Sequence, residues 1–154
     1  MRGNSTPADS ARVYLALGSN LGDRHGRLLE AVERLQASIV IEAISSIYQT
    51  EPWGFADQPR FLNAACAGTT DLSPDEVLAF VKSIEVEMGR EPTFRYGPRA
   101  IDIDVLLYED IIIDTDHYRV PHPGLHTRDF VLTPLAEIAA DVVHPVLQQS
   151  IGSL

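Results

Sequence analysis

Three features of the sequence predict an α+β fold. Apolar or alternating runs typical of β-strands occur at 13–17, 39–49, 61–69 and 101–108. Apolar residues at helical spacing lie between the first and second runs and between the third and fourth. The resulting order, β-α-β-β-α-β, is that of the ferredoxin-like fold. We therefore expect an α/β sandwich, an antiparallel sheet with helices on one face, followed by an added C-terminal hairpin and helical segment.

The first half of the chain is expected to form a strand, a helix and a long strand. The run at 13–17 ends at a turn over 18–20, and Asp23 is the expected N-cap of a helix at about 24–36. The segment 39–49 is β-branched and alternating, which favours one strand. Its expected inward side chains are Ile39, Ile41, Ala43 and Ile47.

A strand at 61–69 and a second helix follow. Ser73 is the expected N-cap of this helix, Pro74 its first residue, and Glu76 the second member of a capping box. Gly89 is expected to end the helix. Its expected buried stripe consists of Val77, Val81, Ile84 and Met88.

The C-terminal third is expected to add a strand, a hairpin and a helix. After the strand at 101–108, the turn residues Glu109-Asp110 are expected to lead into a hairpin with 111–113. A helical stretch is expected from near Thr127, interrupted or restarted at Pro134.

Length and composition indicate one globular domain. The chain has 154 residues, of which 45% are hydrophobic and 22% charged. Residues 1–11 are expected to be a flexible lead-in and 12–154 a single domain. No run approaches the roughly 20 apolar residues of a membrane span, and 1–11 lack a secretory core, so we expect a cytoplasmic protein. The lone Cys66 is expected to be a buried, inert thiol.

The charge pattern favours a small anionic ligand over nucleic acid. A net charge of −10 repels a polyanion. Five of the 12 Lys and Arg residues nevertheless bracket the strand at 101–108. They are Arg90, Arg95, Arg99, Arg119 and Arg128. Their planar guanidinium groups match phosphate oxygens, so this region suits a small, highly charged anion.

Two aspartates on that strand give the strongest functional signal. Asp102 and Asp104 are two residues apart, so in a strand both leave the same face, with Cα atoms about 7 Å apart. Metal pairs that assist phosphoryl chemistry lie roughly 4 Å apart, which suits such carboxylates. The alternative is that both face water on a half-exposed strand that packs Ile103 and Leu107 inward. Strands disfavour aspartate, and like charges on one face repel, which favours the metal site.

Other common sites are not predicted. The turn at 18–22 has neither Gly-x-Gly-x-x-Gly nor a final Gly-Lys-Ser/Thr, which excludes a dinucleotide fingerprint and a P-loop. Pro123-Gly124 separates His122 from His126, which prevents the helical geometry of a zinc site. His122 is kept as a candidate because it lies in a rigid Pro-His-Pro segment near the arginines. Glu85 borders its helix's buried stripe and is either a solvated flank or a ligand contact.

Four sequence blocks occur together in this chain: GSNLG at 18–22, YQTEP at 48–52, FLNAA at 61–65 and RYGPRAIDID at 95–104. In type and order they closely resemble the 6-hydroxymethyl-7,8-dihydropterin pyrophosphokinases, and the resemblance covers nearly everything from 13 to about 145. It implies an enzyme of folate biosynthesis that transfers the pyrophosphoryl group of ATP to the hydroxymethyl oxygen of the pterin and gives AMP. It also implies two Mg²⁺ ions that bridge the triphosphate.

The resemblance further implies roles for individual residues. The implied catalytic residues are Arg90, Arg99, Asp102 and Asp104, of which the two aspartates hold the metal. The implied ATP contacts are Glu85, Arg90, Arg95, Tyr96, Arg99, Val105, His122 and Arg128. The implied pterin contacts are Thr50, Glu51, Trp53, Phe61, Asn63 and Phe130, with the ring stacked between the two phenylalanines. Residues 91–94 lack the further basic residues that are common in the family, which weakens the expected clamp on phosphate.

The expected partners are ATP and the pterin alone, bound by a monomer that contacts neither nucleic acid nor membrane. Two alternatives stay open. One is a metal-dependent nucleotidyltransferase, although the Gly-Ser turn and the Asp-x-Asp strand of that class normally lie close together in sequence, and here Gly18 and Asp102 do not. The other is a ferredoxin-like regulatory module that binds a small ligand.

Overall fold

The computed structural model describes residues 10–20, 22–50, 61–89 and 101–154. The elements are β1 (Ala11–Ser19), α1 (Arg24–Leu35), β2 (Ile39–Ile44), β3 (Tyr48–Thr50), β4 (Phe61–Thr70), α2 (Pro74–Glu87), β5 (Asp102–Tyr108), β6 (Ile113–Asp114), β7 (Arg119–Val120), α3 (Asp129–Ala139) and the 3₁₀ helix η2 (Ile151–Ser153). None of the helices in these ranges combines the length and apolar character needed to cross a bilayer.

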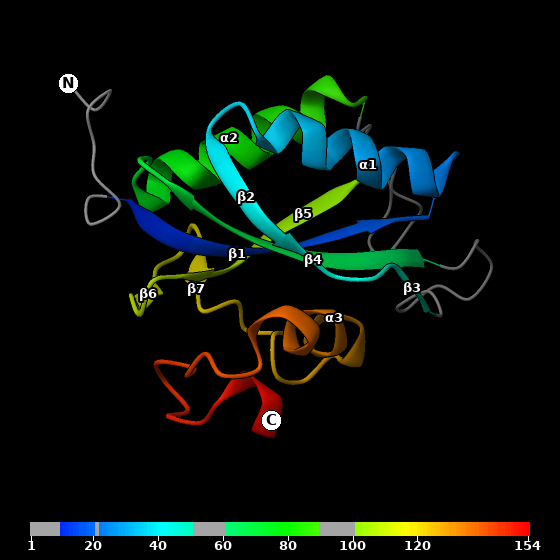
Figure 1. Ribbon diagram of the computed structural model, residues 1–154. Helices are drawn as coiled ribbons and strands as arrows, with labels where there is room; N and C mark the ends of the chain where they lie inside the picture. The colour runs from blue at the N-terminus through cyan, green and yellow to red at the C-terminus, as the bar shows by residue number, and fades with distance from the viewer. Residues whose placement is uncertain (1–9, 21, 51–60, 90–100) are drawn as a thin grey trace.

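The main sheet is antiparallel, with strand order β2-β4-β1-β5, and β3 continues along the same edge of β4 as β2. Helices α1 and α2 cover one face, and α3 covers the other (Figure 1). The ferredoxin-like α+β fold is confirmed. The two core helices, α1 and α2, lie on one face as expected, and α3, in the added C-terminal segment, buries its apolar residues against the opposite face.

Strand alternation gives the sheet two apolar faces. Leu15, Leu17 and Cys66 pack with α1 and α2, whereas Tyr14 and Ala65 pack with α3. Burial raises the pKa of the Cys66 thiol to about 12. The predicted burial of Cys66 is confirmed, and the raised pKa disfavours the thiolate, which is the nucleophilic form of cysteine.

Side-chain caps explain where the first two helices begin. Asp23 Oδ1 accepts a hydrogen bond from the Gly26 N–H at 3.1 Å, as expected of the N-cap. Ser73 and Glu76 form the predicted capping box, with bonds of 3.2 and 2.8 Å. The predicted interruption at Pro134 is wrong, since α3 runs through it. Pro134 is buried, and this packing offsets the one helical hydrogen bond that proline cannot donate.

The predicted long strand at 39–49 is wrong, because the chain leaves the ladder at Ser45. A bulge between Ile41 and Ala43 turns Ala43 to the α3 side of the sheet. The Ser45 hydroxyl then accepts a hydrogen bond from the Ala65 N–H at 2.8 Å. Because a side chain has replaced a backbone group as acceptor, the segment forms two strands, β2 and β3.

A second bulge lies in β5, where Leu106 is the extra residue relative to β1. The bulge directs both Leu106 and Leu107 to the α3 side. The packing of Leu107 on the same side as Ile103, which strand alternation predicted, is therefore wrong. The bulge also frees the Leu106 carbonyl, which accepts a hydrogen bond from the His122 N–H at 3.0 Å. The bulge therefore fixes where His122 lies.

The predicted hairpin between β5 and 111–113 is also wrong. Glu109 adopts a φ of 50°, and the chain leaves the main sheet after Tyr108. Ile113 instead pairs with Val120, so β6 and β7 form a separate small sheet beside β5. Local turn signals could not distinguish these two pairings.

Candidate active site

Gly18 lies at the centre of a row of residues that crosses three strands. It pairs with Asn63 of β4 on one side and with Asp102 of β5 on the other. A Cβ atom at Gly18 would lie 3.0 Å from Asn63 Oδ1 and 3.6 Å from Phe61 Cδ1. Glycine therefore leaves the backbone of β1 without a side chain between the amide of Asn63 and the carboxylate of Asp102.

Asp102 and Asp104 leave β5 on one face, and the buried Ile103 between them points to the other. Asp102 is half-buried and Asp104 is exposed. Their neighbours on β1 are Gly18 and Ala16, so small residues flank both carboxylates. Carboxylate oxygens are ligands that Mg²⁺ prefers, and Mg²⁺ commonly takes its other ligands from water and phosphate. Within the described ranges no cluster of three metal-binding side chains occurs.

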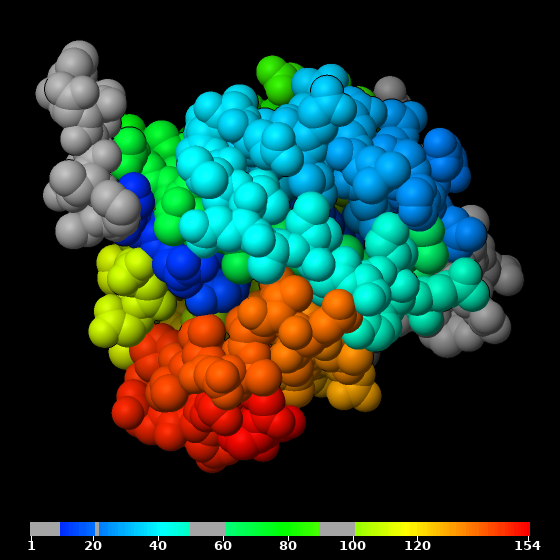
Figure 2. Space-filling model, in the orientation of Figure 1, coloured from blue at the N-terminus to red at the C-terminus, as the bar shows by residue number. Residues whose placement is uncertain are grey.

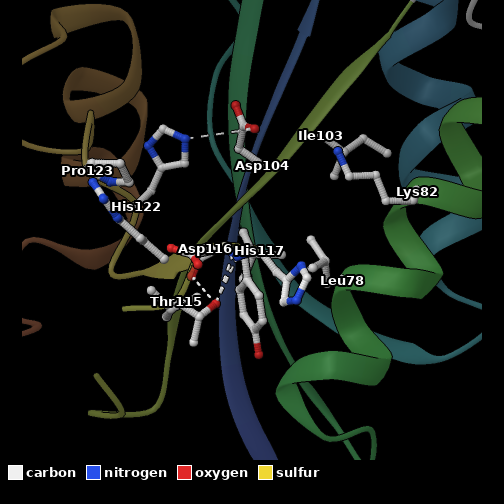
Figure 3. Close-up of a pocket in the computed structure, with 13 residues that line it drawn as sticks. Leu78, Lys82, Ile103, Asp104, Thr115, Asp116, His117, His122 and Pro123 are labelled. Carbon is white, nitrogen blue, oxygen red and sulfur yellow. Dashed lines mark hydrogen bonds and ion pairs between the residues drawn. The ribbon is translucent and has the colours of Figure 1, made fainter. Parts of the chain in front are cut away.

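His122 faces Asp104 from the segment after β7. Its Nδ1 accepts a hydrogen bond from the Gly124 N–H at 3.0 Å, which leaves the proton of the neutral ring on Nε2. Nε2 lies 3.9 Å from Asp104 Oδ1 (Figure 3). Burial lowers the pKa of His122, Asp104 opposes this shift, and Arg128 adds to it. The neutral ring therefore presents an N–H donor beside the carboxylate pair.

Glu85 proves to be buried, with 3% of its surface exposed. One of its carboxylate oxygens accepts a hydrogen bond from the Ile103 N–H at 2.9 Å, and Lys82 Nζ lies 4.0 Å from the other. The reading of Glu85 as a solvated flank is wrong. The side chain instead holds α2 to the outer edge of β5, between the two aspartates.

A pocket of about 470 Å³ lies between α2, the outer edge of β5 and the β6–β7 sheet. In Figure 3, Leu78 and Lys82 extend from α2 on one side, His122 lies on the opposite side, and Asp104 lies between them. Because the Ile103 N–H faces this outer edge, alternation directs the N–H and C=O of Val105 to the same edge. The pocket thus brings the predicted ATP contacts Val105 and His122 together with Asp104, a predicted metal ligand.

Several pocket residues were missed by the sequence reasoning. On α2, Leu78 and Lys82 lie one turn apart, beside the buried stripe, so the helical pattern could have identified them. The pocket residues at 115–118 gave no such signal, because the pairing of β6 with β7 was not foreseen, whereas Arg119 belongs to the arginine group that the sequence singled out. The Tyr118 hydroxyl donates to Asp75 Oδ1 at 2.6 Å and so ties this sheet to α2. Burial and this hydrogen bond raise the pKa of Tyr118 to about 12.

The predicted pterin contacts that the structure describes lie on the α3 side of the sheet. Phe61 and Asn63 are two residues apart on β4, and Phe61 pairs with Thr50 of β3. Phe130 is the second residue of α3, and its ring centroid lies 5.9 Å from Cζ of Arg128. The structure therefore brings both phenylalanines to the face that carries the aspartates.

Six predicted site residues lie outside the described ranges. They are Glu51, Trp53, Arg90, Arg95, Tyr96 and Arg99. Their assigned roles stay predictions.

The fold, with a carboxylate pair beside a pocket, fits the class of small α+β phosphotransferases. The family model described as 7,8-dihydro-6-hydroxymethylpterin-pyrophosphokinase (HPPK) matches residues 14–140. The chain belongs to this family. The predicted family and enzyme class, a pyrophosphokinase of folate biosynthesis, are therefore confirmed.

Relatives match most of this chain. It is 48% identical over 139 residues to the 2-amino-4-hydroxy-6-hydroxymethyldihydropteridine pyrophosphokinase of Aquifex aeolicus. This match covers 90% of this chain and 87% of that protein. It is 46% identical over 144 residues to the folic acid synthesis protein FOL1 of Dictyostelium discoideum, covering 94% of this chain but only 22% of that longer protein.

Solved structures support the fold. A crystal structure of Plasmodium falciparum HPPK-DHPS A437G with pteroate superposes with a TM-score of 0.74 and 16% sequence identity. The match covers 94% of this chain and 42% of that one. At this identity the likeness shows the fold alone.

Proposed function

We propose that this chain transfers the pyrophosphoryl group of ATP to the hydroxymethyl oxygen of 6-hydroxymethyl-7,8-dihydropterin, with Mg²⁺ held by Asp102 and Asp104. The observation that carries the proposal is the position of this pair. The two carboxylates lie on one face, with the pocket beside Asp104 and the Gly18–Asn63 row beside Asp102. A pyrophosphoryl donor bound in the pocket and an acceptor bound at the row would therefore meet at the two carboxylates.

The pocket suits the nucleotide. The backbone groups of Val105 at the edge of β5 can recognise the edge of a base, and Leu78 offers it an apolar surface. Lys82 and Arg119 supply positive charge at the rim. The Nε2–H of His122 can donate to a phosphate oxygen near Asp104, so the triphosphate would extend toward the aspartates.

The row beside Asp102 suits the pterin. A flat ring can lie close to β1 because Gly18 has no side chain, while the Asn63 amide can bond the polar edge of the ring. Phe61 and Phe130 can stack on its two faces. The hydroxymethyl group would then point toward Asp102.

The proposed transfer exchanges one phosphorus–oxygen bond for another. The hydroxymethyl oxygen forms a bond to the β-phosphorus of ATP, the bond from that phosphorus to the oxygen bridging the α-phosphorus breaks, and AMP leaves. The hydroxyl proton is released. Mg²⁺ on the carboxylates would neutralise and align the triphosphate. The residues of the chain contribute mainly alignment and electrostatic stabilisation, and Arg90 and Arg99 are proposed to add charge at the transferring group.

The same proposal includes the finer expectations from the sequence. These are two Mg²⁺ ions, a monomer, a cytoplasmic location, and no contact with nucleic acid or membrane.

AMP formation by the purified protein tests the proposal. The assay omits ATP, the pterin or Mg²⁺ in turn, and AMP is expected only when all three are present. Pterin-independent release of pyrophosphate would instead indicate a nucleotidyltransferase. Binding of the pterin without turnover, at any Mg²⁺ concentration, would favour the regulatory module.

A further inference from the structure

Glu137 of α3 has no role in the site as described above, yet its carboxylate accepts three hydrogen bonds. Oε2 accepts from the backbone N–H of Ser46 at 2.9 Å and from the Ser46 hydroxyl at 3.0 Å. Oε1 accepts from the Tyr48 hydroxyl at 2.5 Å. The Tyr48 hydroxyl, and next the Ser46 N–H, hold the pKa of Glu137 below its ordinary value. Donors from two directions therefore converge on one charged acceptor.

These donors belong to the segment that interrupts the edge of the sheet. Ser46 lies between β2 and β3, and Tyr48 is the first residue of β3. The segment is also held to β4 through the Ser45 hydroxyl, which accepts from the Ala65 N–H. Figure 2 shows the orange surface of α3 directly against the cyan surface of this segment. Glu137 thus joins the helix below the sheet to the edge of the sheet.

Both joined elements carry predicted pterin contacts. On the sheet side, Tyr48 pairs with Asn63, and Thr50 pairs with Phe61. On the helix side, Phe130 precedes Glu137 by seven residues, which is about two turns, so both lie on one side of α3. The bonds to Glu137 therefore connect the element that carries Phe130 to the strands that carry Phe61 and Asn63.

We propose that Glu137 is a positioning residue for the pterin. Its three hydrogen bonds set the separation between the wall formed by Phe130 and the wall formed by Phe61 and Asn63. A flat ring needs a gap of defined width, so loss of this carboxylate weakens pterin binding without removing any group that touches the ring. The inference rests on the proposed function, because it places the pterin between these walls.

The nucleotide side should be insensitive to the same change. The described residues that line the nucleotide pocket come from α2, β5 and 115–123, and none of them comes from β3 or α3. Loss of the Glu137 carboxylate should therefore raise KM for the pterin and not KM for ATP, whereas a general loss of folding would affect both substrates.

The experiment compares Glu137→Gln and Tyr48→Phe with two matched controls. Tyr108→Phe also removes one phenol hydroxyl, which donates to the Leu72 carbonyl at 2.6 Å, remote from the pterin walls. Glu87→Gln removes an exposed carboxylate that pairs with Arg34 on the other side of the sheet. KM for each substrate and kcat are measured well below the melting temperature of every variant. Pterin affinity is also measured by titration in the presence of α,β-methylene-ATP, whose α–β linkage cannot be cleaved.

Glu137→Gln should raise KM and Kd for the pterin by about tenfold, since small misplacements carry large costs, and leave KM for ATP within about twofold. Tyr48→Phe should give a smaller rise, and the double variant should be no worse than Glu137→Gln alone. The controls should leave both KM values unchanged. Unchanged pterin KM and Kd in an active, folded Glu137→Gln variant would overturn the inference, as would equal increases for both substrates. Absence of pterin-dependent AMP formation in the wild type would instead refute the proposed function.

Discussion

A carboxylate oxygen of Glu85 accepts a hydrogen bond from the backbone N–H of Ile103 at 2.9 Å, between the positions of Asp102 and Asp104. β5 is an edge strand, so this N–H has no neighbouring strand as partner. The buried carboxylate takes the place of that strand. It holds the strand that carries the two aspartates against α2.

Glu85→Ala should lower the free energy of unfolding by about 1–3 kcal/mol, because it leaves the Ile103 N–H without its acceptor. Urea denaturation measures the change. Glu87→Ala is the matched control: it removes an exposed glutamate from the same helix and should cost no more than about 0.5 kcal/mol. If the two variants lose the same small amount, the hydrogen bond to Ile103 does not stabilise the fold.

Asp102→Asn and Asp104→Asn should each reduce AMP formation by more than about a hundredfold, because an amide cannot supply the charge that holds Mg²⁺. Both variants should remain folded, since each change removes repulsion between two carboxylates on one face. Pterin affinity should change little. Asp110→Asn, an exposed turn residue just after the same strand, is the control and should keep wild-type turnover. Near wild-type turnover in either site variant would contradict the assignment of the metal to this pair.

Gly18→Ala should raise KM for the pterin by about tenfold or more, because the new methyl group lies 3.0 Å from Asn63 Oδ1 and occupies the surface proposed for the ring. KM for ATP should change little. Gly124→Ala is a matched contrast, since its methyl group would lie 3.0 Å from Nε of Arg128, a predicted ATP contact. It should raise KM for ATP instead. Steady-state kinetics with each substrate varied in turn checks both, and the same pattern in both variants would argue against separate subsites.

The sequence predicted those features that depend on local pattern. The capping box of Ser73 and Glu76 fixed the start of α2, and the two-residue spacing of Asp102 and Asp104 placed both on one face of a strand. The features that were wrong depend on distant contacts. The break at Ser45 needs a partner on β4, and the passage of α3 through Pro134 needs the sheet beneath it.

In the candidate site, too, local features were predictable and features that depend on distant contacts were not. The positions on β4 and β5 follow from strand alternation and were predictable. The burial of Glu85 was not, because its acceptor role exists only when α2 lies against the edge of β5. The pocket residues at 115–118 depend on a pairing of β6 with β7 that competes with an equally plausible hairpin on β5.

His144 gives the C-terminal segment a stability that depends on pH. Its side chain is buried, and Nδ1 accepts hydrogen bonds from the N–H groups of Val146 at 3.2 Å and Leu147 at 3.1 Å. Burial, and next the neighbouring His126, lower the pKa of His144 below its ordinary value. Protonation of Nδ1 would break both bonds. The folded state therefore favours the neutral ring.

The sign of the effect follows from this lowered pKa. The unfolded chain takes up a proton on His144 at its ordinary pKa, about 6.5, whereas the folded chain resists until a lower pH. The stabilisation by neutral His144 is fully present above the unfolded pKa, and it is lost as the pH falls toward and through the lower folded pKa.

His144→Asn should reduce this loss, because an asparagine carbonyl can still accept from the backbone N–H two residues later and does not titrate. Urea midpoints at about pH 8 and about pH 5.5 measure it, and the drop between them should be smaller in the variant than in the wild type. His126→Gln removes only the neighbouring ring, whose centroid lies 6.0 Å from that of His144, and should give an intermediate drop. Equal drops in all three proteins would show that other groups govern the sensitivity to acid.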